Sequence, residues 1–340
     1  MSNPGDLLPL PERSGPGNGL KKKNAASIAS VTAVVPALFA DAGEHAAFSF
    51  IEFFTAQIRN PNTRAAYSVA VRDFSTWCEQ RGLALHQLRS PHVALYIEEL
   101  TGRYSPPTVK QHLAAVRMLF NWLILRQVVE SNPAAAVRGP KYVITKGKTP
   151  VADGDEARQL LESIDATTLV GLRDRALIAL LLYTFARVSA AIGMNVEDYY
   201  PQGRRFWVRL HEKGGKQHDM PAHHVLEHYV DEYLTAASIA ESTTSPLFRT
   251  AAGTTGRLTE RRMHRIDVLR MIQRRTAEAG IATALSCHSF RATGITVYLK
   301  RGGLLEHAQK MAAHASAKTT KLYDRREDQV TLDEVERIVL

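Results

Sequence analysis

Residues 176–182 read ALIALLL, a run in which every side chain is apolar. A helix without a polar face lies inside a protein, so this run predicts a buried helix at the centre of a large domain. The chain has 340 residues, which exceeds one typical domain and is enough for two that each bury a core. We place the buried helix in the second domain, over residues 153–340, where Asp153 and Glu156 form a capping-box pattern that opens the first helix.

A smaller helical domain is predicted over residues 44–138. Apolar residues follow Tyr67 at intervals of four, seven and eleven, and a similar pattern runs from Val109 to Leu123. Both patterns are typical of helices with one apolar face. Residues 139–152 are basic and lack this periodicity, so they predict a linker between the domains. Residues 1–43 are rich in Pro, Gly, Ser, Asn and Ala and predict a flexible N-terminal arm.

The second domain also contains a predicted β-hairpin. Residues 206–210 alternate weakly between apolar and polar, and KGGK at residues 213–216 supplies turn residues before a second short strand at 217–220. Further helices are predicted over residues 222–238, 259–279, 289–301, 304–313 and 318–326. The fold class is therefore mainly α with a small β-sheet. Near the end of the chain, an apolar stripe predicts one more short helix; its members are Leu332, Val335, Ile338 and Val339.

The composition narrows the class of protein and its partners. A hydrophobic content of 45% with 23% charged residues is typical of globular proteins. The formal net charge of +9 favours a polyanionic partner, which on charge alone is DNA, RNA or an anionic lipid surface. Two cysteines are too few for a disulfide framework, and no stretch reaches the about 18 apolar residues of a membrane span. We therefore expect a cytoplasmic protein with no membrane association.

Six polar residues of the second domain stand out by their order and spacing. An arginine follows the buried run in FARVSA, a lysine lies in the hairpin motif EKGGK, a histidine and an arginine are three apart in HSFR, and a second histidine precedes a tyrosine by nine residues. In chain order the six are Arg187, Lys213, His288, Arg291, His314 and Tyr323. Each residue alone fits an ordinary structural role, such as a helix cap, a turn residue or a core aromatic. Their joint spacing favours a shared site.

This ordered set resembles the active site of the tyrosine recombinases, the phage-integrase and Xer-type group of DNA strand-exchange enzymes. The resemblance extends over about residues 45–340. It implies a helical core-binding domain and a mostly helical catalytic domain that clamp duplex DNA at a specific recombination site. It also implies cutting and rejoining of DNA through a 3′-phosphotyrosyl intermediate, without a metal or other cofactor. In this family a C-terminal segment often packs on a neighbouring protomer in a tetramer on DNA, so the resemblance implies an exchange helix over residues 331–340.

The resemblance assigns a role to each of the six residues. Arg187 and Arg291 would bind the extra negative charge of a pentacoordinate phosphorane through paired hydrogen bonds. Lys213 and His288 would supply the proton donor and the proton acceptor that the leaving 5′ oxygen and the attacking phenol require. His314 would donate a hydrogen bond to a phosphate oxygen, and Tyr323 would be the nucleophile that becomes attached to the 3′ phosphate.

Three positions depart from the family pattern. Phe185 stands where glycine is common before the Arg187 motif, and Ala313 stands where glycine is common before the second histidine. Ala190 stands where a glutamate often follows Arg187 by three residues. The carboxylate that supports the site is therefore absent from its usual position, and our interpretation is that another acidic residue, with Asp198 as the candidate, compensates.

Two basic segments are candidates for DNA contact. Lys110 and Arg117 lie on the stripe opposite the apolar face of their helix, and a solvated face is the alternative explanation for this stripe. Arg261, Arg262 and Arg265 lie in a second basic segment, which we predict to be helical. Contacts between these side chains and phosphates would make DNA affinity fall steeply with salt.

Two other functions compete with this interpretation. His224, Glu227 and His228 spell HxxEH, the inverted zinc-peptidase pattern, although a polar surface helix explains the same residues. The other alternative is a DNA-binding accessory protein that keeps the fold and has lost cleavage. The complete set of six residues argues against this second alternative.

Overall fold

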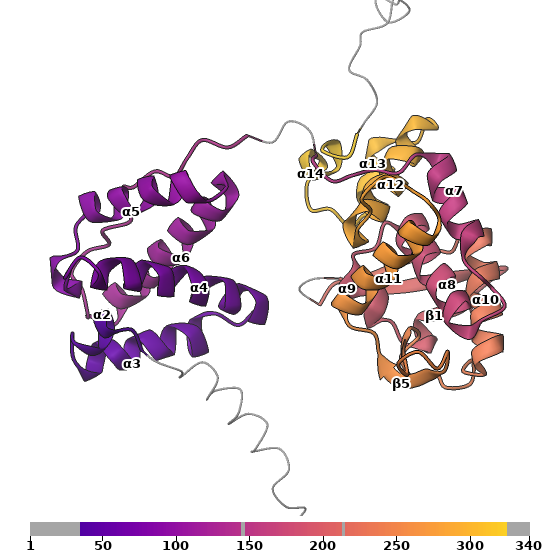
Figure 1. The fold of residues 1–340 in the computed structure, drawn as a ribbon, viewed down its shortest axis with the longest axis horizontal. Helices are drawn as coiled ribbons and strands as arrows, with labels where there is room; N and C mark the ends of the chain where they lie inside the picture. The colour runs from indigo at the N-terminus through magenta and orange to yellow at the C-terminus, as the bar shows by residue number, and fades with distance from the viewer. Residues whose placement is uncertain (1–34, 144–146, 213–214, 325–340) are drawn as a thin grey trace, which may run out of the picture. The chain divides into compact units, whose positions relative to one another are not determined.

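The computed structural model describes residues 35–143, 147–212 and 215–324. The chain divides into two compact units, residues 1–143 and residues 144–340. Figure 1 shows that both units are built mainly from helices. The division falls inside residues 139–152, the segment that we predicted as a linker. Within the described residues, no helix is long and apolar enough to cross a membrane.

The first unit is a bundle of helices around an aromatic core. Its helices are α2 (Ala37–Ala40), α3 (Glu44–Glu52), a π-helical turn (Phe53–Gln57), α4 (Pro61–Glu79), a 3₁₀ turn (Leu85–Gln87), α5 (Ser90–Arg103) and α6 (Pro106–Leu125). Pro61 and Pro106 occupy first positions of helices, where the missing N–H costs nothing. Phe74 and Phe120 are buried and pack edge to face in the centre. The periodic segments of the sequence therefore form helices whose apolar faces meet.

The end of the predicted arm belongs to this core. Residues 35–43 were assigned to the arm by composition, yet α2 lies within them. Phe39 is fully buried and its ring stacks on that of Phe50, with centroids 4.6 Å apart. Because this segment contains few apolar residues, the sequence did not indicate that Phe39 is buried in the core. Residues 1–34, which make up the rest of the predicted arm, lie outside the described residues.

The second unit packs helices around α8 and carries two small sheets. Its helices are α7 (Gly154–Ser163), α8 (Leu169–Thr184), α9 (Val188–Gly193), α10 (His224–Ala237), α11 (Arg265–Glu278), α12 (Cys287–Lys300), α13 (Leu305–Met311) and α14 (Ala317–Lys321). Strands β1 (Tyr199–Gln202), β2 (Arg205–His211) and β3 (Gln217–Pro221) form an antiparallel sheet in that order, and β4 (Arg249–Ala251) pairs with β5 (Leu258–Arg262). The mainly α class with small sheets is confirmed, as is the hairpin of β2 and β3.

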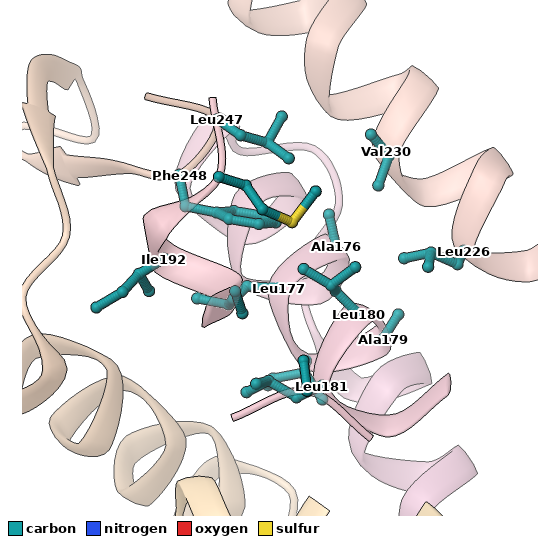
Figure 2. Packing of buried hydrophobic residues seen from close by; sticks show 14 of the residues in the cluster. Ala176, Leu177, Ala179, Leu180, Leu181, Ile192, Leu226, Val230, Leu247 and Phe248 are labelled. Carbon is teal, nitrogen blue, oxygen red and sulfur yellow. The ribbon is translucent and has the colours of Figure 1, made fainter. Parts of the chain in front are cut away.

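Helix α8 is the buried helix that the apolar run predicts. The side chains from Ala176 to Leu181 are completely buried, and α8 packs against α10 and α12. Figure 2 shows Leu177 and Leu180 among side chains of the surrounding elements. Residues such as these each gain about 1.5–3 kcal/mol from burial, so α8 organises the unit. The predicted capping box also forms, because Asp153 and Glu156 each accept a hydrogen bond from the other's backbone N–H.

One predicted helix is partly wrong. The segment 259–279 was predicted to be helical throughout, but residues 258–262 form β5 and α11 begins at Arg265. Arg249 of β4 pairs with Arg262, and the N–H of Met263 donates to the carbonyl of Phe248. These bonds form a hairpin with β4, which lies outside the segment 259–279, so the periodicity of that segment did not reveal them. The apolar stripe at the end of the chain lies outside the described residues.

Candidate active site

Five of the six predicted site residues gather in the second unit. His288 and Arg291 lie in the first turns of α12, Arg187 caps α9, and His314 and Tyr323 flank α14. His288 and His314 both contact Tyr323, and the charges of Arg187 and Arg291 both act on His314. Lys213, the sixth residue, lies outside the described residues, between β2 and β3.

Tyr323 is buried between the two histidines. Its hydroxyl oxygen lies 2.7 Å from Nε2 of His288, and its ring is stacked on that of His314 with centroids 5.6 Å apart. The hydroxyl of Thr296 donates to the carbonyl of Tyr323 at 2.9 Å. The N–H of Gly147 donates to the carbonyl of Leu322 at 2.9 Å, so the segment that leads into the unit also holds the backbone next to the tyrosine.

Both histidines are neutral near pH 7. Burial lowers the pKa of His288 from 6.5, and the charges of Arg291 and Arg187 lower it further. The same causes in the same order lower the pKa of His314 to about 3. Nδ1 of His314 is hydrogen-bonded to the hydroxyl of Thr320 at 2.9 Å. A neutral imidazole has one nitrogen that accepts a hydrogen bond, so Nε2 of His288 is suited to receive the proton of the Tyr323 hydroxyl.

Arg291 is a buried cation held by backbone carbonyls. Its residue is 1% exposed, and the guanidinium donates to the carbonyls of Phe185 and Ala312. Burial, and next the charge of Arg187, lower the pKa of Arg291 to about 10, so it remains protonated at neutral pH. Its Nε has no hydrogen-bond partner among the described residues. A buried, charged donor without a partner is suited to an anionic ligand.

Phe185 precedes Arg187 by two residues, and its carbonyl accepts a hydrogen bond from Arg291. Its conformation and packing also explain one departure from the family pattern. It ends α8 in the left-handed conformation with φ of 54°, which glycine adopts more easily. Its ring occupies space beside Gly294, where an added Cβ would lie 2.7 Å or less from two ring carbons and 2.2 Å from the carbonyl oxygen of Leu182. The aromatic ring therefore packs in the place that Gly294 leaves open, while the Phe185 carbonyl binds Arg291.

Ala313 occupies a similar position before His314. Its φ is 46°, again in the left-handed region, and it follows the end of α13. The N–H of His314 donates to the carbonyl of Gln309 at 3.1 Å, which closes the turn. The glycine that is common at this position in the resembled family would adopt this conformation without strain.

Arg187 pairs with a carboxylate that the sequence analysis did not assign. Its guanidinium donates to Oε2 of Glu212, the residue that follows β2. The expected substitute, Asp198, is instead bonded to Nε2 of His211 at 3.0 Å and to the N–H of Asn195 at 2.8 Å. The interpretation of Asp198 as the compensating carboxylate is therefore wrong. The available signal was the place of Glu212, directly before Lys213 in the hairpin motif.

The five candidate DNA-contact residues differ in solvent exposure and in whether their side chains are already hydrogen-bonded within the protein. Lys110, Arg261 and Arg265 are exposed. Arg117 donates to the carbonyls of Ala134 and Val137, so it secures its own unit. The remaining residue, Arg262, donates to the carbonyls of Ile192 and Met194 and to the side chain of Asn195. Arg117 and Arg262 are therefore hydrogen-bonded within their own units. Lys110, Arg261 and Arg265 remain the candidates for phosphate contact.

The HxxEH residues do not form a metal-binding group. Glu227 accepts a hydrogen bond from the N–H of Phe206 at 3.3 Å, and His228 lies 3.6 Å from Glu232. Within the part of the chain that the structure describes, no three His, Cys, Asp or Glu side chains are grouped to hold a metal ion. His224 and His228 are exposed on α10, and Glu227 is half-buried.

Two family models match the chain in succession. Residues 150–329 match the phage integrase family, and residues 49–130 match the phage integrase N-terminal SAM-like domain. Among curated proteins, tyrosine recombinase XerC of Myxococcus xanthus is 26% identical over 287 residues, covering 82% of this chain and 90% of the relative. Tyrosine recombinase XerD of Oceanobacillus iheyensis is 29% identical over 234 residues, covering 67% and 74%.

Solved structures share the fold at low sequence identity. The XerH site-specific recombinase in a post-cleavage complex with a palindromic difH substrate has a TM-score of 0.65 and 17% identity, with 92% of each chain covered. A lambda integrase dimer bound to a COC′ core site has a TM-score of 0.64 and 15% identity, covering 91% of this chain and 84% of the other. These similarities establish the architecture of the chain.

Proposed function

This chain belongs to the phage integrase family and is a tyrosine-type site-specific recombinase, and on this premise we propose that Tyr323 is its nucleophile on DNA. The observation that carries the proposal is the 2.7 Å separation between the Tyr323 hydroxyl and Nε2 of His288. The guanidinium groups of Arg187 and Arg291 lie close enough for their charges to lower the pKa of His314, whose ring stacks on Tyr323. A phenol, a neutral base and two cations are the groups that attack on a phosphodiester requires.

In the cleavage step, the Tyr323 oxygen forms a bond to the scissile phosphorus while the bond from phosphorus to the 5′ oxygen breaks. His288 takes the phenol proton through Nε2, which its lowered pKa leaves free to accept. The leaving 5′ oxygen receives a proton from Lys213. In the second step a 5′ hydroxyl gives its proton to Lys213 and its oxygen bonds to phosphorus while the bond from phosphorus to the Tyr323 oxygen breaks, and that oxygen regains its proton from His288. One phosphoester bond is exchanged for another in each step, so neither step requires an external energy source.

Arg187 and Arg291 stabilise the charge that develops on the phosphate oxygens. Arg291 is fixed in place by two carbonyls before DNA arrives, which supports preorganisation of its charge. His314 completes the set. Its Nδ1 is hydrogen-bonded to the hydroxyl of Thr320, and in the tautomer in which Nδ1 accepts this bond, Nε2 carries the proton and donates to a phosphate oxygen.

DNA binding and self-association follow from the family. We assign phosphate contacts to Lys110, Arg261 and Arg265, which are exposed basic side chains. The net charge of +9 supports a polyanionic substrate. We assign assembly to a tetramer on two copies of a specific DNA site, with residues 331–340 as the exchange helix. A tetramer provides the second 5′ hydroxyl that strand exchange consumes.

The test uses a nicked DNA substrate whose cleaved fragment diffuses away and so traps the covalent complex. The wild-type chain is incubated with this DNA carrying the cognate site, and the adduct is digested and sequenced by mass spectrometry. Attachment of the 3′ phosphate to Tyr323 is the expected result. A chain that occupies the site and makes no adduct would instead be an accessory DNA-binding protein.

A further inference from the structure

Arg187 has a carboxylate partner from a different element of the unit. Its guanidinium donates to Oε2 of Glu212, whose side chain is 5% exposed, whereas that of Arg187 is 41% exposed. The buried member of this pair is therefore the carboxylate, and the exposed member is the cation. In this arrangement the carboxylate of Glu212 fixes the direction of the Arg187 guanidinium, and the remaining N–H groups of the guanidinium stay available to a ligand.

The negative charge of Glu212 interacts with both Arg187 and Arg291. Arg187 lowers the pKa of Arg291 because the two cations repel each other, and Glu212 raises it. The carboxylate thus lowers the electrostatic cost of holding two guanidinium groups together in a partly dry site. His288 and His314 are neutral there and cannot replace it.

Helix α9 carries no carboxylate that could perform this task. Ala190 lies three residues after Arg187, one helical turn along, and is 2% exposed. Its methyl group belongs to the hydrophobic core of the unit. The glutamate that often follows this arginine in the resembled family is therefore absent from α9, while Glu212 approaches the arginine from the sheet.

We propose that Glu212 is the positioning residue for Arg187, and that it directs the guanidinium toward the scissile phosphate in place of a carboxylate at position 190. This inference rests on the proposed function, because it concerns the same site. The N–H of Glu212 donates to the carbonyl of Lys216 at 2.7 Å. The backbone of Glu212 is therefore held next to the start of β3, while its side chain directs Arg187.

The experiment measures the single-turnover cleavage rate on the nicked substrate at saturating DNA. Glu212→Gln keeps the shape and removes the charge, and we expect cleavage to slow by about 10- to 100-fold while DNA affinity changes less than about threefold. Glu212→Ala gives the same information if the glutamine variant does not fold, since Arg187 is exposed and stays solvated. Asp219→Asn is the matched control, because Asp219 lies on β3 and pairs with Arg209 at 3.2 Å.

A double-mutant cycle separates positioning from a general structural effect. If Glu212 acts through Arg187, adding Glu212→Gln to Arg187→Lys costs less than about threefold, well below its cost in the wild type. Equal costs in both backgrounds would overturn the inference, and so would a wild-type cleavage rate in Glu212→Gln. A wild-type chain that forms no adduct would overturn the proposed function itself, which distinguishes the two failures.

Discussion

The hydroxyl of Tyr323 and Nε2 of His288 are 2.7 Å apart, which places an acid and its base in hydrogen-bond contact across 35 residues of sequence. His288 lies in the first turn of α12, whereas Tyr323 follows α14. Contact between them therefore depends on how α12, α13 and α14 pack. The pair that we propose to be reactive is formed by tertiary structure, and changes in that packing are expected to affect cleavage.

Tyr323→Phe removes the hydroxyl and leaves a ring that still stacks on His314. We expect wild-type affinity for the cognate site and no covalent adduct on nicked DNA, because the phenol oxygen forms the bond to phosphorus. Gel analysis of the denatured complex measures the adduct. A normal yield from this variant would remove Tyr323 from the nucleophile role.

Arg187→Ala and Arg291→Ala should each slow cleavage by about 10²-fold or more, with most DNA affinity retained. Both substitutions should also lower stability, for different reasons. Loss of Arg291 leaves two buried carbonyls without their donor and should cost about 2 kcal/mol or more. Loss of Arg187 leaves the buried carboxylate of Glu212 without its cation. Denaturant titration and single-turnover cleavage check both points. Near-normal cleavage by either variant would exclude that residue from the site.

His314 should make the second unit sensitive to mild acid. Its pKa of about 3 in the folded chain lies below the ordinary 6.5, so the unfolded chain binds the proton first. Stability is complete above pH 6.5 and falls as the pH drops toward 3, by about 1.4 kcal/mol per pH unit for this proton. The difference in Tm between wild type and His314→Gln should therefore narrow from pH 7.5 to pH 5.5. A constant difference would contradict the buried neutral histidine.

Gly294→Ala should disturb both stability and cleavage. The added Cβ would lie 2.2 Å from the carbonyl oxygen of Leu182, which is backbone and cannot easily move. We expect a loss of about 1–3 kcal/mol, and slower cleavage because Phe185 and its bond to Arg291 must shift. Gly193→Ala is the control, since nothing lies within 4 Å of its Cβ position. Equal Tm values for both variants would refute the close packing around Gly294.

Deletion of residues 331–340 tests the exchange helix. The truncated chain should fold and bind a single site, yet lose cooperative occupation of paired sites and recombine poorly. Analytical ultracentrifugation on DNA with one or two sites measures the assembly. Unfolding of the truncated chain would show instead that the segment completes its own catalytic unit, and normal assembly with normal recombination would exclude both roles.

Local patterns predicted much of the fold and most of the site. The run at residues 176–182 needs no knowledge of its partners to be placed in a core, because it has no polar face. The β2–β3 hairpin was also predictable, since its turn chemistry is contained in four consecutive residues. The family resemblance then selected a small set of polar residues, five of which the fold gathers.

Features that depend on distant partners were not predictable. Glu212 reaches Arg187 across 25 residues, and its place directly before Lys213 did not indicate that Arg187 would be its partner. Arg117 and Arg262 looked available for DNA because basic residues are usually solvated, yet carbonyls from distant segments bind them. Phe39 was predicted to belong to a flexible arm, but its ring stacks on that of Phe50 in the core of the first unit.

The bond from the Gly147 N–H to the Leu322 carbonyl joins two segments of the second unit that are far apart in sequence. Gly147 lies near the start of the second unit, and through this bond it holds the peptide group that precedes Tyr323. The backbone of Tyr323 is also held by the hydroxyl of Thr296. A substitution that shifts residue 147 is therefore expected to shift the backbone of the proposed nucleophile as well.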